Sequence, residues 1–195
     1  MNRREERNLG WGSFLNNISI IVTGMPGAGK DEFISVANVL GMRDFHMGNT
    51  VKLYAKRKGI EMTDTAIGQF ATQERENYGK HIWAERTLES LKGTTGIVID
   101  GLRNLEELDY MRARISDLTV VAIFANRKDR LERILRRHRV DDISDLESLV
   151  KRDNRELSWG IGTVIALSDR MIVNDGTLEE FKIKSRQLLE NLLRQ

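Results

Sequence analysis

The sequence predicts an α/β fold with a parallel sheet, and three features of the chain support this. Short β-branched runs alternate with longer segments in which apolar residues recur at helical spacing. A glycine-rich segment, 24–30, stands between the first of these runs and the first helical segment. The 195 residues are 40% apolar and 31% charged, a composition that can bury a core and excludes a disordered chain, collagen or a coiled coil.

Five runs are expected to form the strands of the sheet. The clearest are continuous apolar runs, as buried parallel strands require, and the run at 44–47 is the weakest. The expected strands are 18–23, 44–47, 96–100, 118–124 and 171–173. Helices are expected at 30–40, 105–111, 127–139, 146–157 and 177–193, the last opening with a capping box from Thr177 to Glu180. Residues 49–91 also have a helical pattern, broken near Gly59 and Gly79.

The expected domain organisation is one α/β domain, 17–195, preceded by a polar extension at 1–16. Two helical, charge-rich connections are too long for a minimal strand–helix–strand unit, at about 48–92 and 126–158. Ligands of open α/β sheets bind outside the carboxyl ends of the strands. We therefore expect both connections to be insertions over that edge.

Composition narrows the cellular context. The chain has no cysteine, which excludes disulfides, thiolate catalysis and cysteine-based zinc sites and fits a cytoplasmic protein. No apolar run approaches the roughly 20 residues of a membrane helix, and the charged start lacks the apolar core of a secretory signal. A net charge of +2 gives no whole-molecule attraction to nucleic acid.

The segment 24–30 reads GMPGAGK and matches the phosphate-binding pattern G-x-x-x-x-G-K. Glycines let backbone amides converge on phosphate oxygens, the following helix presents its positive end, and Lys30 can reach the β- and γ-phosphates. A strand directly before and a helix directly after strengthen the match, although a strand-to-helix turn that binds nothing also has this composition. The residues expected to hold the nucleotide phosphates are Met25, Pro26, Gly27, Ala28, Gly29, Lys30 and Asp31.

Asp31 departs from the pattern, which requires Ser or Thr as a Mg²⁺ ligand at that position. A carboxylate is a good hard ligand for Mg²⁺, but without metal it repels phosphate. At ~4 Å that repulsion is about 1 kcal/mol in water and about 4 kcal/mol at an effective dielectric constant of 20. The alternative is an acid that merely stabilises the first turn of a helix.

Asp100 ends an expected buried strand, where P-loop proteins commonly place a second Mg²⁺ anchor. Asp-Gly is also ordinary turn chemistry, so the phosphate loop is what favours the catalytic interpretation. Arg103 follows three residues later and could face the same cleft.

The expected helix 127–139 carries seven basic residues and begins where a strand ends. Helical spacing places Arg130, Arg133 and Arg137 on one face. Phosphoryl transfer needs cations around the equatorial oxygens, and arginine suits that role, so we expect a phosphate-closing lid. A solvated face or an RNA-binding patch is the alternative. Arg152 and Arg155 form a second set on the next helix.

The three histidines show no metal-ligand spacing and are expected to be surface or packing residues, as are Trp83 and Trp159.

Several segments from residue 18 onward resemble an archaeal group of P-loop nucleotide kinases related to dephospho-CoA kinase and adenylate kinase. The phosphate loop with Glu32-Phe33 is similar to the opening motif of that group. The other matching segments are 100–107 (DGLRNLEE), 137–142 (RHRVDD), 152–166 (RDNRELSWGIGTVIA), 174–175 (ND) and 178–181 (LEEF).

The resemblance implies a nucleoside monophosphate kinase-like fold and transfer of a phosphoryl group from ATP, with Mg²⁺, to a nucleotide-like acceptor. It implies that Arg137 and Arg139 act in a lid and that 48–92 is an acceptor insertion containing Arg75. The last strand and helix, with Asn174 and Asp175, would hold the donor base beside Arg133. The acceptor-contacting residues would be Asn49, Lys52, Arg75, Arg103, Arg152 and Arg155.

Two departures keep other functions open. Asp31 replaces the loop hydroxyl, and Asn49 and Lys52 stand where the group has Asp-x-x-Arg. Asn49 cannot act as a carboxylate base, and lysine does not reproduce a bidentate arginine. These residues favour a nucleotide-binding regulator with little turnover. An NTP-dependent RNA-associated protein is the third possibility.

Overall fold

The computed structural model describes residues 18–91, 94–137 and 145–194. Its centre is a parallel sheet of five strands in the order β2-β3-β1-β4-β5. The strands are β1 (Ser19–Thr23), β2 (Arg43–His46), β3 (Ile97–Asp100), β4 (Leu118–Phe124) and β5 (Arg170–Val173). The α/β class, the parallel sheet and all five expected strands are confirmed.

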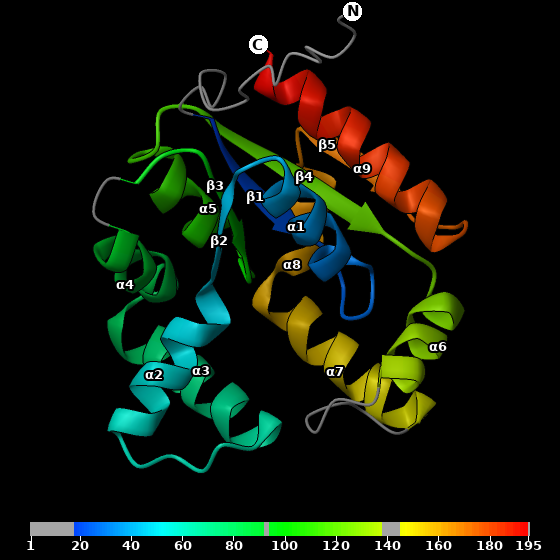
Figure 1. Cartoon of the computed structure of the whole chain (residues 1–195). Coiled ribbons are helices and arrows are strands. Elements are labelled where there is room, and N and C mark those ends of the chain that lie inside the picture. Colours follow the sequence, from blue (N-terminus) through cyan, green and yellow to red (C-terminus); the bar gives the residue numbers. More distant parts are fainter. Residues whose placement is uncertain (1–17, 92–93, 138–144, 195) are drawn as a thin grey trace, which may run out of the picture.

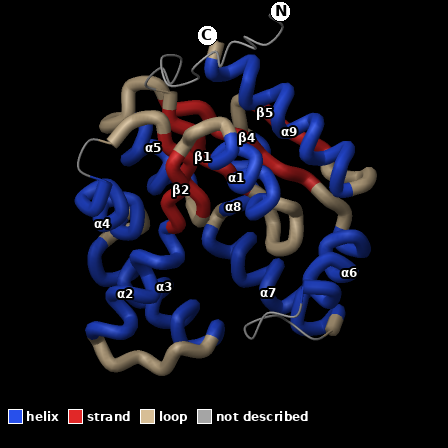
Figure 2. The backbone as a smooth tube through the Cα atoms, viewed as in Figure 1, coloured by secondary structure: helices blue, strands red, loops and turns tan. Residues whose placement is uncertain are grey.

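Helices cover both faces of this sheet, as parallel strands require (Figure 1). The helices at the sheet are α1 (Lys30–Val39), α5 (Leu105–Arg112), α8 (Ile161–Ala166) and α9 (Leu178–Leu193). Those of the two long connections are α2 (Met47–Arg57), α3 (Asp64–Tyr78), α4 (Ile82–Leu91), α6 (Arg127–Arg137) and α7 (Leu146–Trp159). In Figure 2, α2–α3 and α6–α7 form two groups beyond the same edge of the sheet.

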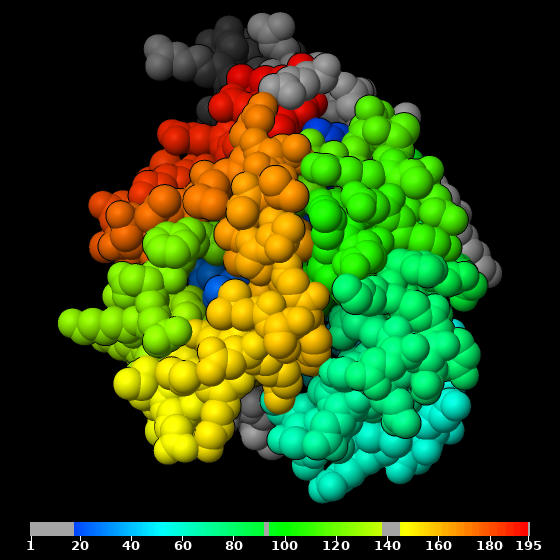
Figure 3. Space-filling view, turned by 180° about the vertical axis from the view of Figure 1, so that it is seen from behind, coloured from blue at the N-terminus to red at the C-terminus, as the bar shows by residue number. Residues whose placement is uncertain are grey.

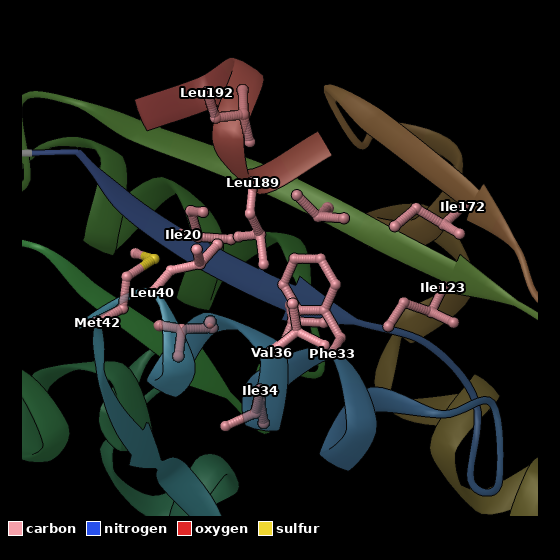
Figure 4. Packing of buried hydrophobic residues seen from close by; sticks show 14 of the residues in the cluster. Ile20, Phe33, Ile34, Val36, Leu40, Met42, Ile123, Ile172, Leu189 and Leu192 are labelled. Atoms are coloured by element: carbon pink, nitrogen blue, oxygen red, sulfur yellow. The ribbon is translucent and has the colours of Figure 1, made fainter. Parts of the chain in front are cut away.

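The side-chain alternation of β1 divides the core in two. Ile20 and Val22 face α1 and α9, and Ile21 faces the helices of the other side. Figure 3, from behind, shows α8 and α5 on that second side. In Figure 4, Phe33 of α1 and Leu189 of α9 meet over the strands. The strands are buried on both faces, which is why they read as continuous apolar runs.

Two expectations about the elements need correction. Met47 does not continue the second strand; it begins α2 and is buried in the core. We expected no separate helix at 161–166, but these residues form α8. Gly160, in a left-handed conformation with φ 111°, separates α8 from α7. The breaks near Gly59 and Gly79 are confirmed and separate α2, α3 and α4.

None of the helices in the described ranges is both long and apolar enough to cross a lipid bilayer. The expected extension, 1–16, lies outside the described residues.

Candidate active site

The phosphate loop, 24–30, leaves β1 at the carboxyl edge of the sheet and enters α1 at Lys30. Gly29 precedes α1 with φ 113°, and a Cβ there would lie 2.5 Å from Nδ2 of Asn174. That same amide nitrogen donates a hydrogen bond to the carbonyl of Ala28 at 2.8 Å. Glycine is therefore required for both backbone conformation and space, and the loop after β5 is tied to the phosphate loop.

Lys30 lies at the inner end of the phosphate loop. Its Nζ donates to the carbonyl of Gly24 at 2.8 Å and to that of Met25 at 3.4 Å. Burial lowers the pKa of Lys30, and the Asp100 carboxylate is the largest influence in the opposite direction. The parallel register pairs Val22 with Asp100, which places the end of β3 beside the start of the loop.

Asp100 is held ionised by its neighbours. Burial alone would raise its pKa, but Lys30, His46 and Arg103 together bring the pKa below its usual value. Its Oδ1 is buried and has no hydrogen-bond partner among the described residues. An ionised carboxylate with an unpaired oxygen at the edge of the phosphate loop fits a hard cation, and Asp100 could hold Mg²⁺ there.

His46 has a place in this site that sequence reasoning missed. Its Nδ1 lies 3.5 Å from Oδ2 of Asp100, and its Nε2 lies 3.0 Å from Oδ2 of Asp44. The contact with Asp100 raises the pKa of the imidazole. The weak strand pattern at 44–47 was the available signal, since a strand paired with β3 in this register sets His46 opposite Asp100.

The arginine face of α6 turns toward the phosphate loop. Arg130, only 4% exposed, binds both carboxylate oxygens of Asp153 at 2.9 and 2.6 Å and donates to the carbonyl of Pro26 at 2.9 Å. Arg133 donates to the carbonyl of Asn174 at 3.0 Å. Arg130 is thus a buried structural link between α6, α7 and the loop, unlike a solvated lid residue.

The last described residue of that face, Arg137, approaches Asp31. Their Nη1 and Oδ2 atoms are 3.8 Å apart, and both side chains are partly exposed. The space-filling view shows a hollow between α6 (light green) and the α7–α8 region (yellow to orange), with blue atoms of the early chain at its bottom (Figure 3). Asp31 therefore has a cationic partner that neither of its two expected roles included.

On the other side of the site, four charged residues join α3, α5 and α7. Arg75 binds Oε1 of buried Glu107 through Nε at 3.1 Å and Nη2 at 2.9 Å. Glu107 also accepts a hydrogen bond from the backbone N–H of Arg103 at 2.7 Å. The guanidinium of Arg103 in turn lies 3.4 Å from buried Glu156. Burial alone would lower the pKa of Arg103, but the carboxylates of Glu156, Asp100 and Glu107 raise it above its usual value.

Arg152 and Arg155, both on α7, also pair with acids. Arg152 reaches Glu156 at 3.5 Å, and Arg155 reaches Asp64 of α3 at 2.5 Å. Sequence reasoning assigned no role to the buried acids Glu107 and Glu156. Their positions in the resembling segments were the available signal.

The remaining expected residues lie farther out or outside the description. Asn49 and Lys52 are exposed on α2, and the contacts just described do not include them. Asp175 is exposed and lies 3.4 Å from Lys184. Arg139 is outside the described residues. Trp83 is fully buried, as expected for a packing residue.

This fold and this loop define a P-loop protein with a kinase-like architecture. Residues 20–156 match the family model described as an AAA domain.

The chain belongs to the UPF0200 family of archaeal proteins. It is 61% identical over 170 residues to UPF0200 protein TV0279 of Thermoplasma volcanium, covering 87% of this chain and 95% of that one. The UPF0200 protein of Methanothermobacter thermautotrophicus is 37% identical over 180 residues, or 91% and 92% of the chains. The archaeal P-loop resemblance is confirmed.

Solved structures show the same fold at low identity. A shikimate kinase from Acinetobacter baumannii in complex with shikimate has a TM-score of 0.57 and 16% identity, covering 94% of this chain and 95% of that one. A gluconokinase from Sinorhizobium meliloti also has a TM-score of 0.57, with 19% identity and coverage of 91% and 94%.

Proposed function

We propose that the protein is a kinase that transfers the γ-phosphoryl group of ATP to a small-molecule acceptor. The observation that supports this best is the position of Asp100, which the strand register places beside the end of β1 and the phosphate loop and which has one carboxylate oxygen unpaired among the described residues. A phosphate loop alone serves many nucleotide-binding proteins. Its combination with an ionised carboxylate and arginines on two sides meets the needs of phosphoryl transfer.

Each group has a defined part in this proposal. The amides of 25–31 and Lys30 bind the β- and γ-phosphates, and Arg137 approaches the transferred group from α6. The resemblance implies the same role for Arg139. Asp100, with Asp31 as a second candidate, would hold the Mg²⁺ that neutralises charge developing on the phosphates. Arg133, Asn174 and Asp175 would border the donor base.

The acceptor would lie on the opposite side of Lys30, toward the arginine–glutamate cluster of Arg75, Arg103 and Arg152. The resemblance implies a nucleotide-like acceptor contacted also by Asn49, Lys52 and Arg155. Shikimate kinase and gluconokinase, which share the fold, are named for small hydroxylated acids. These names support a small-molecule acceptor. They do not identify its chemical class, which depends on the residues of this chain.

A coupled assay of ADP release tests the proposal. Mg-ATP is supplied with one acceptor at a time from a panel of nucleoside monophosphates, dephospho-CoA, shikimate and gluconate. We expect release that depends on one acceptor and is lost in Lys30→Ala. If Mg-ATP binds in calorimetry but no acceptor causes ADP release, the kinase proposal would be contradicted. The nucleotide-binding regulator, which the departures at Asp31 and Asn49 support, would then be favoured.

The burial of Arg130 weakens the case for the RNA-associated alternative. Its basis was the basic run of α6, yet Arg130, Arg133 and Arg137 are engaged with Asp153, Asn174 and Asp31. Arg130 is buried and cannot contact RNA, so this face of α6 offers RNA phosphates fewer guanidinium groups than the sequence indicated.

A further inference from the structure

A row of polar side chains from α1 and β2 leads to Asp100 from the edge of the sheet. Side chains two residues apart in a strand lie on the same face. The register sets Asp44 beside Val98 and His46 beside Asp100. Val98 packs in the core with residues of α1, so all four of these side chains lie on the α1 side of the sheet.

Polar contacts join the members of this row. Nδ2 of Asn38, on α1, donates a hydrogen bond to Oδ1 of Asp44 at 3.0 Å. Oδ2 of Asp44 lies 3.0 Å from Nε2 of His46, and Nδ1 of the same ring lies 3.5 Å from Oδ2 of Asp100. The second contact is long, and contacts of this kind commonly shorten when a ligand binds. Because both ring nitrogens face carboxylates, the imidazole is held from two sides.

The two oxygens of the Asp100 carboxylate have different surroundings. Oδ2 faces His46, whereas Oδ1 is buried and has no hydrogen-bond partner among the described residues. A buried oxygen without a donor is costly unless a ligand satisfies it. The terminal torsion of an aspartate is soft, so a contact that holds one oxygen decides where the other one points.

The other cationic neighbours of Asp100 are directed elsewhere. Lys30 donates to two carbonyls of the phosphate loop, and the guanidinium of Arg103 lies 3.4 Å from Glu156. Both act on Asp100 through their charge. The orientation of the carboxylate therefore depends on His46.

We propose that His46 is a positioning residue of the magnesium site: it holds Oδ2 of Asp100 so that Oδ1 is directed to the cation, while Asp44 holds the imidazole. The inference rests on the proposed function in taking Asp100 as the carboxylate that holds Mg²⁺. Groups that orient a metal-binding side chain commonly change metal affinity about 10- to 100-fold when they are substituted.

Two neutral amides distinguish the two nitrogens of the imidazole. Counted along the side chain, the amide nitrogen of asparagine stands at the position of Nδ1, and that of glutamine at the position of Nε2. His46→Asn therefore retains a donor toward Asp100, and His46→Gln retains one toward Asp44. His46 is the N-cap residue of α2, where asparagine is favoured, so His46→Asn is expected to remain folded.

Calorimetric titration with ADP tests the role of His46 without requiring turnover. The readout is the magnesium gain, defined as the Kd of ADP with chelator divided by the Kd with saturating Mg²⁺. His46→Gln should lower the magnesium gain about tenfold, and His46→Asn should retain most of it, with the metal-free Kd unchanged in both. His81→Gln is the matched control and should leave the magnesium gain unchanged, because His81 is a partly exposed histidine 3.7 Å from Glu85 of α4.

Asp44→Ala tests the contact behind the imidazole. Asp44 is exposed on the edge strand β2, so its substitution is expected to leave the fold intact. The magnesium gain should fall by a smaller factor than in His46→Gln. If Asp44 acts through His46, adding Asp44→Ala to His46→Gln should lower the magnesium gain no further.

Three results would overturn the role of His46. The first is a magnesium gain that His46→Gln leaves unchanged or that both amide variants lower equally. The second is an equal loss of ADP affinity with and without Mg²⁺, which would mean that His46 supports the phosphate loop and not the carboxylate. The third is ADP binding by the unsubstituted protein that does not depend on Mg²⁺.

This inference and the proposed kinase can fail separately. A magnesium gain that changes as expected, with no ADP release for any acceptor, would retain the role of His46 and reject the kinase. Acceptor-dependent ADP release, with a magnesium gain that His46→Gln leaves unchanged, would retain the kinase and reject the role of His46.

Discussion

Lys30 is a partly buried lysine whose ammonium group is held by the oxygens around it. Two loop carbonyls accept its hydrogen bonds, and Asp100 supplies the compensating negative charge. This arrangement fixes the position of the cation before any phosphate reaches it. Fixed charges require little reorganisation during a reaction, which is the basis of electrostatic catalysis.

Lys30→Ala should weaken ADP binding strongly. The substitution removes a charge-assisted hydrogen bond worth roughly 1.5–3 kcal/mol, which corresponds to a roughly 10- to 150-fold higher Kd. Isothermal titration calorimetry measures the effect. Lys151→Ala, which removes an exposed lysine of α7 paired with Glu147, is the matched control and should leave the affinity unchanged. Equal affinities for the Lys30 variant and the unsubstituted protein would disprove phosphate binding by Lys30.

Asp31 should make nucleotide binding depend on both Mg²⁺ and Arg137. With chelator present, Asp31→Ser removes repulsion of about 1 kcal/mol at ~4 Å in water, so metal-free ATP should bind roughly fivefold more tightly. With Mg²⁺, the carboxylate can serve as a ligand and the change should be smaller. The experiment compares dissociation constants of both proteins under both conditions.

The ion pair of Asp31 with Arg137 adds a second readout. Because Arg137 loses a partner in Asp31→Ser, the effects of Asp31→Ser and Arg137→Gln on ATP affinity should not be additive. Glu32→Gln in the same helical turn is the control, since Glu32 pairs with Lys182 of α9. Full additivity, together with an unchanged metal-free Kd in Asp31→Ser, would leave Asp31 as a residue that only stabilises the start of α1.

At the scale of elements, α6 is attached to the phosphate loop by a buried ion pair. Arg130 and Asp153 are 4% and 1% exposed, and Arg127 adds a contact to the same carboxylate at 3.3 Å. Gly27 fits this contact, because a Cβ there would lie 2.8 Å from the carbonyl oxygen of Arg130. One face of α6, with Arg130 and Ile134 buried, is therefore packed on the loop, and the opposite face is exposed.

Arg130→Met should destabilise the fold. Removing one partner of a buried pair leaves an uncompensated charge and costs about 3–5 kcal/mol. Urea denaturation followed by circular dichroism measures the free energy of unfolding. Arg136→Met is the control on the same helix, because Arg136 is 76% exposed and its pair with Glu132 is worth about 0–1 kcal/mol. Similar midpoints for the two variants would show that the Arg130 pair contributes little.

The sequence allowed prediction of elements where a local pattern determines them. The strands of the sheet centre read as apolar runs because helices cover both faces, and the capping box at Thr177 and Glu180 is present. The short helix α8 was missed because six residues after Gly160 carry too few turns for a periodic pattern. The same distinction applies to the site residues. Lys30 and Asp100 could be predicted because each belongs to a local sequence motif.

The ion pairs around these two residues were not predictable from spacing. Arg75 and Glu107 are 32 positions apart, and Arg130 and Asp153 are 23 apart. Such pairings depend on how helices pack, and a single sequence contains no periodicity that reports them. His46 required knowledge of the strand register, which places it beside Asp100.

At the scale of the whole molecule, the proposed nucleotide site joins segments from across the chain. The phosphate loop is next to the end of β3 through the pairing of Val22 with Asp100, and hydrogen bonds join it to Arg130 of α6 at Pro26 and to Asn174 after β5 at Ala28. A ligand bound among these segments contacts only the folded state. Its binding free energy therefore adds to the stability of the whole domain.

Mg-ADP should raise the melting temperature of the full chain. At a ligand concentration of 100 times Kd the stabilisation is about 2.7 kcal/mol, which for a domain of this size corresponds to a rise of roughly 5–10 °C. Differential scanning calorimetry over a series of Mg-ADP concentrations measures the shift, which should grow with the logarithm of concentration. The same series with Lys30→Ala should require a much higher concentration, since the variant binds more weakly. A melting temperature independent of Mg-ADP, or a shift of the same size in Lys30→Ala at every concentration, would contradict nucleotide binding at the phosphate loop.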